Sequence, residues 1–366
     1  MNKEKKIIVI IGTRAQLIKT APFIKELEKT KTPFSFIFTG QHSDTIDDLL
    51  TEFKISKPTL NLQEKFEADT LGKGFFWLIK TIYYFIFKKS QIFSNLDKKS
   101  IIITHGDTTT TCLVALFSKL YGYRVAHLES GLRSFNIFNP FPEEINRIIT
   151  FCFSDIYLCP NEWALNNLKN YRGKKINTKG NTLIDSLKIA LATTAIPEIH
   201  DKKFALVSIH RFENLFFKSR FLELINEIQK LSTKIKIKFV LHPVTEKILK
   251  KRNLFESLKG NPNIELSPRM GYSKFMQTLK NSEYMISDGG SNQEECSYLG
   301  TPCLLMRKKT ERIEGLDSNI VISKFDTKII EDFHLNHKKY RKEINLATES
   351  PSSISLESLK LILNEK

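Results

Sequence analysis

Three acidic residues stand where the chain passes from a strand-like run to a helix-like run. Asp107 and Glu129 each follow an apolar run, and Glu143 comes directly after Pro142, a residue typical of a helix start. A single acid at such a place is as often a helix N-cap as a catalyst. Three acids that converge are costly unless they share protons or bind substrate, and they suit general acid/base chemistry at a poorly acidic C–H bond.

Basic residues near these acids could balance their charge or bind an anion. Arg133 and Arg147 flank Glu143 in the sequence, and Arg14 follows the first apolar run, where a guanidinium can bind phosphate through two hydrogen bonds. Lys19 lies further along the same helix-like stretch, where a solvated helix face is the favoured interpretation and a phosphate contact the alternative. His210 follows a strand-like run in the second half, where a functional and a structural histidine are equally good interpretations.

A glycine-rich turn, Gly289-Gly290-Ser291, precedes another helix-like stretch. Its N–H groups and the positive helix end could bind phosphate, although the turn could also be purely structural. Glu295 suits a ribose diol or the helix dipole. The chain has no Gly-x-Gly-x-x-Gly after its first apolar run and no P-loop, and its histidines lack the spacing of a zinc site. We therefore expect no redox cofactor and no catalytic metal.

Two series of alternating elements must position these residues. The predicted strands are 7–11, 34–38, 101–104 and 125–128, then 204–209, 237–241, 264–266, 284–286 and 303–306, with amphipathic stretches between them. This alternation predicts an α/β fold of two doubly wound, Rossmann-like domains with an intervening cleft, residues 1–183 and 184–348. A helix within 349–366 is expected to pack back on the first domain. Ligands bind beyond the carboxyl ends of such strands, which is where the motifs lie.

The length and composition indicate a globular protein with more than one domain. The chain has 366 residues, more than the roughly 250 to 300 at which a single hydrophobic core stops growing. It is 41% hydrophobic and 26% charged, as in a soluble globular protein. Its 56 Lys+Arg and 40 Asp+Glu give a net charge of +16, but the basic residues are spread out and match no nucleic-acid motif. The five cysteines form no CxxC pattern, which indicates reduced thiols in a cytoplasmic protein.

One apolar stretch, 75–87, approaches the composition of a membrane segment. It is shorter than the roughly 18 to 20 residues that a membrane span needs, and Lys80 interrupts it. We predict a buried helix or a subunit contact rather than stable membrane insertion.

Taken together, the motifs resemble those of the UDP-N-acetylglucosamine 2-epimerase family, in its non-hydrolysing bacterial branch. The resemblance covers nearly the whole chain, and the matching segments occur in the family's order. They are Gly12-Thr13-Arg14 with Ile18-Lys19 and Ala21-Pro22, Gly40-Gln41-His42, His105-Gly106-Asp107-Thr108-Thr109-Thr110-Thr111, His127-Leu128-Glu129 with Gly131-Leu132-Arg133, Pro142-Glu143-Glu144 with Asn146-Arg147, Gly180-Asn181-Thr182 with Ile184-Asp185, His210-Arg211 with Glu213-Asn214, Gln293-Glu294-Glu295, and Thr310-Glu311-Arg312.

The resemblance implies a GT-B-like fold and interconversion of UDP-N-acetylglucosamine and UDP-N-acetylmannosamine without a cofactor. In this family UDP is eliminated to a glycal and added back, which supplies precursors of surface polysaccharides. A homodimer acting on a UDP-HexNAc is implied. The catalytic residues implied are Asp107, Glu129, Glu143 and His210, and the substrate-binding residues are Arg14, Lys19, Arg133, Arg147, Gly290, Ser291, Glu295 and Arg312.

Some positions depart from the family pattern. Gln16 stands where the family usually has Glu, and Phe212 where it has a second Arg. Ser43, Asp44 and Ala68 replace polar residues linked to allosteric activation, so we do not expect that activation here. The alternatives are an epimerase of a modified UDP-sugar such as a diacetamido uronate, a hydrolysing variant, or a GT-B-type glycosyltransferase.

Overall fold

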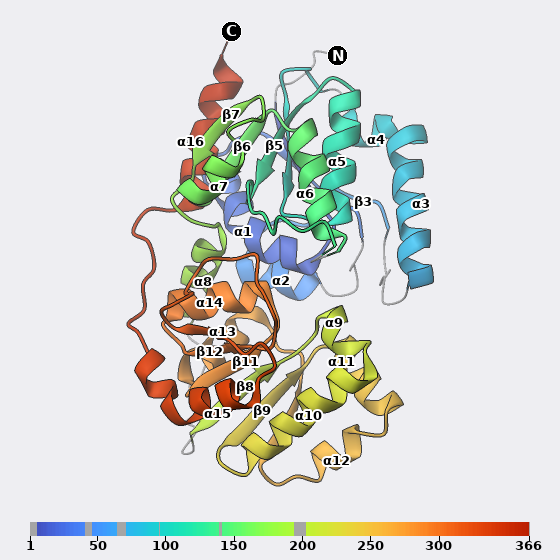
Figure 1. The fold of residues 1–366 in the computed structure, drawn as a ribbon. Coiled ribbons are helices and arrows are strands. Elements are labelled where there is room, and N and C mark those ends of the chain that lie inside the picture. Colours follow the sequence, from blue (N-terminus) through green and yellow to red (C-terminus); the bar gives the residue numbers. More distant parts are fainter. Residues whose placement is uncertain are drawn as a thin grey trace. The chain divides into compact units, whose positions relative to one another are not determined.

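The computed structural model describes residues 6–40, 46–63, 71–94, 96–138, 141–193 and 203–365. The chain forms two compact units (Figure 1). Unit 1 comprises Met1–Ser186 and Ala347–Lys366, and unit 2 comprises Leu187–Leu346. Positions 43, 44 and 68, on which the expectation about allosteric activation rests, lie outside the described residues.

Unit 1 is built on a seven-stranded parallel sheet of the order β3-β2-β1-β4-β5-β6-β7. All five residues of β1 are fully buried, because a parallel sheet is covered by helices on both faces. The strands described are β1 (Ile7–Ile11), β2 (Phe34–Phe38), β3 (Leu60–Asn61), β4 (Ile101–His105), β5 (Arg124–Leu128), β6 (Ile156–Cys159) and β7 (Lys174–Asn177).

Helices cover both faces of this sheet. An apolar core under one face joins β1 and β4 to α3, α4 and α5, and the C-terminal helix α16 packs against α1. The helices of unit 1 are α1 (Arg14–Lys29), α2 (Asp47–Phe53), α3 (Leu71–Phe87), α4 (Lys89–Phe93), α5 (Thr109–Leu120), α6 (Glu143–Phe153), α7 (Glu162–Asn167), the first residues of α8 (Leu183–Ala192), and α16 (Pro351–Asn364).

Unit 2 has a six-stranded parallel sheet of the order β10-β9-β8-β11-β12-β13 and its own apolar core. The strands are β8 (Phe204–Ser208), β9 (Lys236–Leu241), β10 (Ile264–Pro268), β11 (Tyr284–Ser287), β12 (Cys303–Leu305) and β13 (Ile320–Ile322). The helices are α9 (Phe212–Leu215), α10 (Lys218–Ser232), α11 (Pro243–Lys251), α12 (Phe255–Lys259), α13 (Tyr272–Asn281), α14 (Gly290–Leu299), α15 (Thr327–Asn336) and the 3₁₀ helix η1 (His337–Tyr340).

The α/β class with two doubly wound parallel sheets is confirmed, and each predicted strand is present to within two residues at its ends. Four further strands, β3, β6, β7 and β13, were not predicted and have two to four residues each. β7 is an edge strand whose Lys174 and Lys175 show no apolar run. Short or polar edge strands carry too weak a pattern to be recognised alone.

The apolar stretch 75–87 is helical, as predicted, but only one face is buried. Trp77, Thr81 and Phe85 are buried, whereas Phe76 and Phe87 are among the large side chains of α3 that remain exposed. The helix is therefore buried along one face within unit 1, and the subunit contact stays a prediction. No helix in the described ranges is long and apolar enough to cross a membrane.

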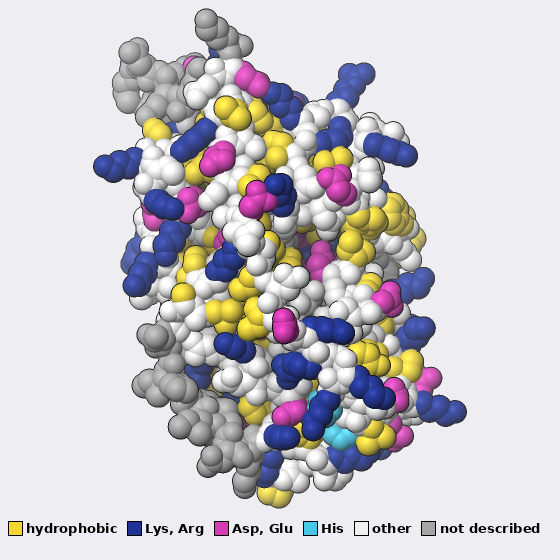
Figure 2. Space-filling model, turned by 90° about the vertical axis from the view of Figure 1, so that its left-hand side faces the viewer, with side chains coloured by type: hydrophobic (Ala, Val, Ile, Leu, Met, Phe, Trp, Pro, Cys, Tyr) yellow, Lys and Arg dark blue, Asp and Glu magenta, His cyan; other side chains and the backbone are white. Residues whose placement is uncertain are grey.

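The basic side chains are dispersed over the visible surface of the protein (Figure 2). On the face shown in Figure 2, Lys and Arg side chains are spread among acidic, apolar and other residues rather than gathered into one patch. The net charge of +16 therefore does not form a basic binding patch for a large anionic partner on this face.

Candidate active site

Strands β4 and β5 bring two of the predicted acids to the same edge of the unit 1 sheet. His105 is paired in register with Leu128, so both strands end at the same level. The N–H of Gly106 still bonds the carbonyl of Leu128 at 3.0 Å, after which both chains turn away from the sheet with positive φ, 69° at Gly106 and 59° at Glu129. Asp107 and Glu129 thus leave neighbouring strands side by side.

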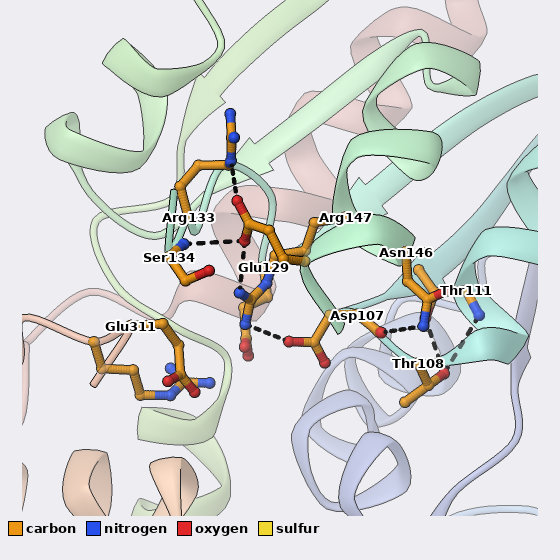
Figure 3. Close-up of polar contacts among 12 residues, drawn as sticks. Asp107, Thr108, Thr111, Glu129, Arg133, Ser134, Asn146, Arg147 and Glu311 are labelled. Atoms are coloured by element: carbon orange, nitrogen blue, oxygen red, sulfur yellow. Dashed lines mark hydrogen bonds and ion pairs between the residues drawn. The ribbon is translucent and has the colours of Figure 1, made fainter. Parts of the chain in front are cut away.

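Asp107 lies between two residues of helix α6. Arg147 donates from Nη2 to Asp107 Oδ2 at 2.5 Å, and Asn146 donates from Nδ2 to the Asp107 carbonyl at 3.0 Å (Figure 3). The Asp107 side chain keeps 28% of its surface exposed, while Arg147 keeps 3%. The carboxylate is therefore fixed by a buried cation yet accessible to a ligand.

A second carboxylate, Glu144, anchors the cations of this site. Its fully buried side chain accepts from Arg133 Nε at 2.5 Å, from Arg147 Nη1 at 3.0 Å and from the backbone N–H of Ser134 at 3.0 Å. Burial raises the pKa of Glu144, but these hydrogen bonds and the charge of Arg133 outweigh burial and leave the pKa below its ordinary value. Glu144 is thus a structural anion that holds Arg133 and Arg147 in place.

Glu129 has a different set of partners. Its Oε2 accepts from Lys19 Nζ at 2.5 Å and from Asn181 Nδ2 at 2.5 Å, and His105 Nε2 lies 3.5 Å away. The side chains of Lys19 and Glu129 are 6% and 5% exposed. The interpretation of Lys19 as part of a solvated helix face is therefore wrong. The Lys19 ammonium is buried and pairs with the Glu129 carboxylate.

The remaining predicted residues of unit 1 lie close in sequence to these groups. Glu143 is the first residue of α6, follows the cis peptide bond Phe141–Pro142, and is half-buried. Arg14, at the start of α1, pairs both terminal nitrogens with the carboxylate of Asp48, at 2.6 and 2.7 Å. That geometry is the one a guanidinium uses for phosphate, and here a carboxylate of the same unit occupies it.

In unit 2 the predicted His210 is positioned by a residue that sequence reasoning did not single out. Asp288, fully buried after β11, accepts from the N–H groups of His210 and Arg211, each at 3.0 Å, and from Asn214 Nδ2 at 2.9 Å. His210 Nδ1 lies 3.5 Å from Asp288 Oδ1, and the ring remains 37% exposed. Asp288 thus holds the turn that presents His210.

The glycine-rich turn does open a helix, as predicted. Helix α14 begins at Gly290, and no described side chain caps its N-terminus. Ser287 Oγ accepts from the Gly289 N–H at 3.1 Å, which leaves the N–H groups of the first turn, including that of Ser291, facing the helix end. Glu295 is buried and accepts from Asn292 Nδ2 at 3.0 Å. This is the geometry of an anion site at a helix N-terminus.

Buried ion pairs support the turn at Gly290. Arg312 binds Glu294 at 2.7 Å, and Glu311 binds Arg307 at 2.7 Å. A Cβ on Gly290 would lie 3.0 Å from Arg312 Nε, so any other residue there would push the arginine side chain away by a few tenths of an ångström. Arg312 therefore lies directly beside the start of α14.

Sequence reasoning missed Glu144, Asp288 and Asn181 as supporting residues. Each lies next to or within a motif already noted, but only the fold reveals what its side chain contacts. The signal for Glu144 was its spacing of three residues from Arg147, which places the two on one helix face. Among the described residues no cluster of three or more His, Cys, Asp or Glu side chains could hold a metal.

Two parallel sheets, one with carboxylates at the ends of adjacent strands and the other followed by a glycine-led helix, form an arrangement typical of α/β proteins that bind nucleotides. The model of the UDP-N-acetylglucosamine 2-epimerase family matches residues 25–349, and the chain belongs to that family.

Curated relatives agree along almost the full length. The UDP-N-acetylglucosamine 2-epimerase of Methanocaldococcus jannaschii is 34% identical over 356 residues, which cover 91% of this chain and 93% of the relative. The enzyme of the same name from Campylobacter jejuni is 33% identical over 338 residues, 87% of this chain and 85% of the relative.

Solved structures match as well. UDP-GlcNAc 2-epimerase from Neisseria meningitidis, bound to UDP-GlcNAc, is 29% identical with a TM-score of 0.83, covering 97% of this chain and 100% of that one. The Methanocaldococcus jannaschii enzyme in complex with UDP-GlcNAc and UDP is 30% identical with a TM-score of 0.85, covering 97% and 99%. The predicted GT-B-like class is thereby confirmed at the level of its two sheets.

Proposed function

We propose that the protein is a non-hydrolysing UDP-N-acetylglucosamine 2-epimerase that interconverts UDP-GlcNAc and UDP-ManNAc. The observation that carries the proposal is the pair Asp107 and Glu129 at the ends of adjacent strands, each held by its own buried cation, Arg147 and Lys19. Two separately held carboxyl groups suit a reaction in which one group removes a proton and another returns it.

The proposed reaction begins with loss of the proton at C2 of the sugar to a carboxylate. The C–H electron pair forms the C1=C2 double bond of a glycal, and the C1–O bond breaks with its electrons leaving on UDP. In the return step a UDP oxygen attacks C1, and a carboxyl group delivers a proton to the opposite face of C2. Asp107, Glu129 and Glu143 are the proposed acids and bases, and Arg133 and Arg147 the cations that orient them and the substrate.

Unit 2 is proposed to hold the nucleotide. Its N–H groups at Gly290 and Ser291 suit a phosphate, and buried Glu295 suits the ribose hydroxyls. His210 and Arg312 are proposed to contact the departing diphosphate. From unit 1, Arg14 would exchange the Asp48 carboxylate for a phosphate of the substrate, with Lys19 nearby on the same helix.

The proposal extends to cellular context. A homodimer is supported by the exposed apolar face of α3, and a reducing, cytoplasmic location by cysteines that form no disulfide, one of which, Cys152, is exposed. The product would serve as a precursor of surface polysaccharide. The alternatives remain a modified UDP-sugar as substrate, hydrolysis to a free sugar and UDP, or glycosyl transfer.

Incubation with UDP-GlcNAc alone in deuterated water, followed by NMR, tests the proposal. Epimerisation yields UDP-ManNAc with deuterium at C2, with no NAD and no acceptor. Free N-acetylmannosamine with UDP would establish the hydrolysing variant instead. Absence of exchange with every UDP-HexNAc, together with transfer once an acceptor is added, would establish a glycosyltransferase.

Two substitutions assign the acids. Asp107→Asn and Glu129→Gln should each lower turnover at least ~100-fold, the lower range for loss of a general acid or base. Glu357→Gln, at an exposed position of α16, is the matched control and should leave turnover unchanged. Near-normal turnover in both site variants would reassign these carboxylates to structural roles.

A further inference from the structure

A buried histidine connects the two loops that carry the proposed acids. His127 lies in β5, two residues before Glu129, and is 1% exposed. Its Nε2 lies 2.7 Å from the carbonyl oxygen of Gly106, the residue before Asp107. Its Nδ1 lies 2.9 Å from Oγ of Ser130, the residue after Glu129. One ring therefore contacts the backbone of one loop and the side chain of the other.

The partners of the ring determine its tautomer. The Gly106 carbonyl can only accept, so Nε2 carries the proton and donates it. Nδ1 is then an acceptor for the hydroxyl proton of Ser130. Burial lowers the pKa of His127 to about 4, against the opposing effects of the Gly106 carbonyl and the charges of Glu129 and Asp107, while Arg147 also lowers it. The ring is neutral at neutral pH.

Beyond the bond from the Gly106 N–H to the Leu128 carbonyl at 3.0 Å, no backbone hydrogen bond among the described residues links the two loops, and the His127 ring supplies the next connection. Both Gly106 and Glu129 have left-handed backbone angles, and there both chains leave the ladder of β4 and β5. Ser130 is tied by its N–H to Leu158 of β6 and Asp107 by its carbonyl to Asn146, so each loop is anchored to a different neighbour. The His127 ring bonds to both loops at once.

We infer that His127 is a positioning residue whose neutral imidazole sets the separation of Asp107 and Glu129 by linking Gly106 to Ser130. The inference rests on the proposed function, in which these two carboxyl groups act on the same carbon atom. A misplacement of about 1 Å in a reacting group can cost about 100-fold in rate, so the link matters to turnover more than to binding.

Two substitutions cut the link at different ends. Gln places its amide nitrogen as many bonds from Cβ as His Nε2, so His127→Gln retains a donor for Gly106. Asn places its amide oxygen as many bonds from Cβ as Nδ1, so His127→Asn retains an acceptor for Ser130. Each should lower kcat about 10- to 100-fold with KM changed less than about threefold, and Ser130→Ala should lower kcat less than either.

Phe151→Leu is the control for a general loss of packing. The Phe151 ring packs against the His127 ring, with centroids 5.7 Å apart, and is equally buried, but it makes neither hydrogen bond. The Phe151→Leu substitution should lower the melting temperature while leaving kcat per folded molecule near that of the wild type. An equal loss of kcat in Phe151→Leu and the His127 variants would overturn the inference, as would wild-type kcat in His127→Asn and Ser130→Ala.

Two readouts separate this inference from the proposed function. Nitrogen NMR of labelled histidines, with His127→Gln for assignment, should show a neutral Nε2–H ring from pH 8 down to about pH 5. A charged ring at pH 7 would overturn the inference even if epimerisation is observed. The pH–rate profile of His127→Gln should keep the wild-type limbs, and loss of a limb would make His127 a proton carrier instead. If the wild type fails to exchange C2 with any UDP-HexNAc, the proposed function fails, whatever the ring shows.

Discussion

Replacing Asp288 by Asn should destabilise unit 2 and release the turn that carries His210. The carboxylate is fully buried, and its Oδ2 accepts from Arg211 N at 3.0 Å and Asn214 Nδ2 at 2.9 Å, while Oδ1 accepts from His210 N at 3.0 Å. An Asn side chain keeps only one acceptor oxygen. Its NH₂ group would face two donors, or one donor if the amide is flipped.

The neighbour cannot simply adapt. Asn214 Nδ2 also donates to the Met306 carbonyl at 3.0 Å, so turning its own oxygen toward the introduced amide would break that bond. With the amide oxygen in the Oδ2 position, the bonds from Arg211 N and Asn214 Nδ2 are kept, and the bond from the His210 N–H to Oδ1 is lost, at roughly 1.5 to 3 kcal/mol. The unfolding free energy of unit 2 should therefore fall by about 1.5 to 3 kcal/mol.

The two units can be followed separately in one sample. Both tryptophans of the chain, Trp77 and Trp163, lie in unit 1, so tryptophan fluorescence in urea reports that unit. Hydrogen exchange of β8 and β11 peptides reports unit 2. Asp288→Asn should accelerate exchange in unit 2 with little change in the fluorescence transition, and should weaken UDP binding.

Asp326→Asn is the matched control, because Asp326 is an exposed N-cap of α15 in the same unit and Asn caps equally well. It should change neither readout. Exchange protection in Asp288→Asn within about 1 kcal/mol of the wild type would refute the assignment of Asp288 as the support of the His210 turn.

Three further predictions concern unit 1. Gly131→Ala should destabilise the fold by about 3 kcal/mol, since φ is 90° and the new Cβ would lie 2.1 Å from the Ala164 carbonyl oxygen; a melting temperature equal to that of the wild type would contradict this. Arg147→Lys should lower kcat at least about 10-fold, because one ammonium cannot replace two guanidinium nitrogens bound to separate carboxylates; unchanged steady-state kcat would show that Asp107 needs no guanidinium. Acidification should destabilise the protein through His127. The pKa of His127 falls from 6.5 to about 4 on folding, so the unfolded chain binds the proton first. About 3 kcal/mol of unfolding free energy is therefore lost as the pH drops from about 6.5 to 4. In urea titrations at several pH values, the unfolding free energy of the wild type should fall with decreasing pH more steeply than that of His127→Gln. Identical slopes of unfolding free energy against pH would contradict the low pKa of His127.

Much of the fold could be predicted because most of its strands are encoded by a local run of apolar residues. The run Ile7–Ile11 is apolar throughout and ends at Gly12, so a buried strand is its only good interpretation. The β7 strand, with Lys174 and Lys175, lies at a sheet edge and gives no such pattern. Helix α3 has an apolar composition on nearly all sides, so its sequence could not indicate which face unit 1 would cover.

The sequence by itself determined the class of fold, most of the strands and the positions of Asp107 and Glu129 directly after two of them, because hydrophobic periodicity and turn residues are local properties. The tertiary structure alone decided which side chains meet. Lys19 reads as a surface lysine, yet it lies against Glu129, 110 residues away, and His127 reads as a strand residue, yet it links two loops. Such contacts depend on strand order and register, which place residues that no local pattern relates.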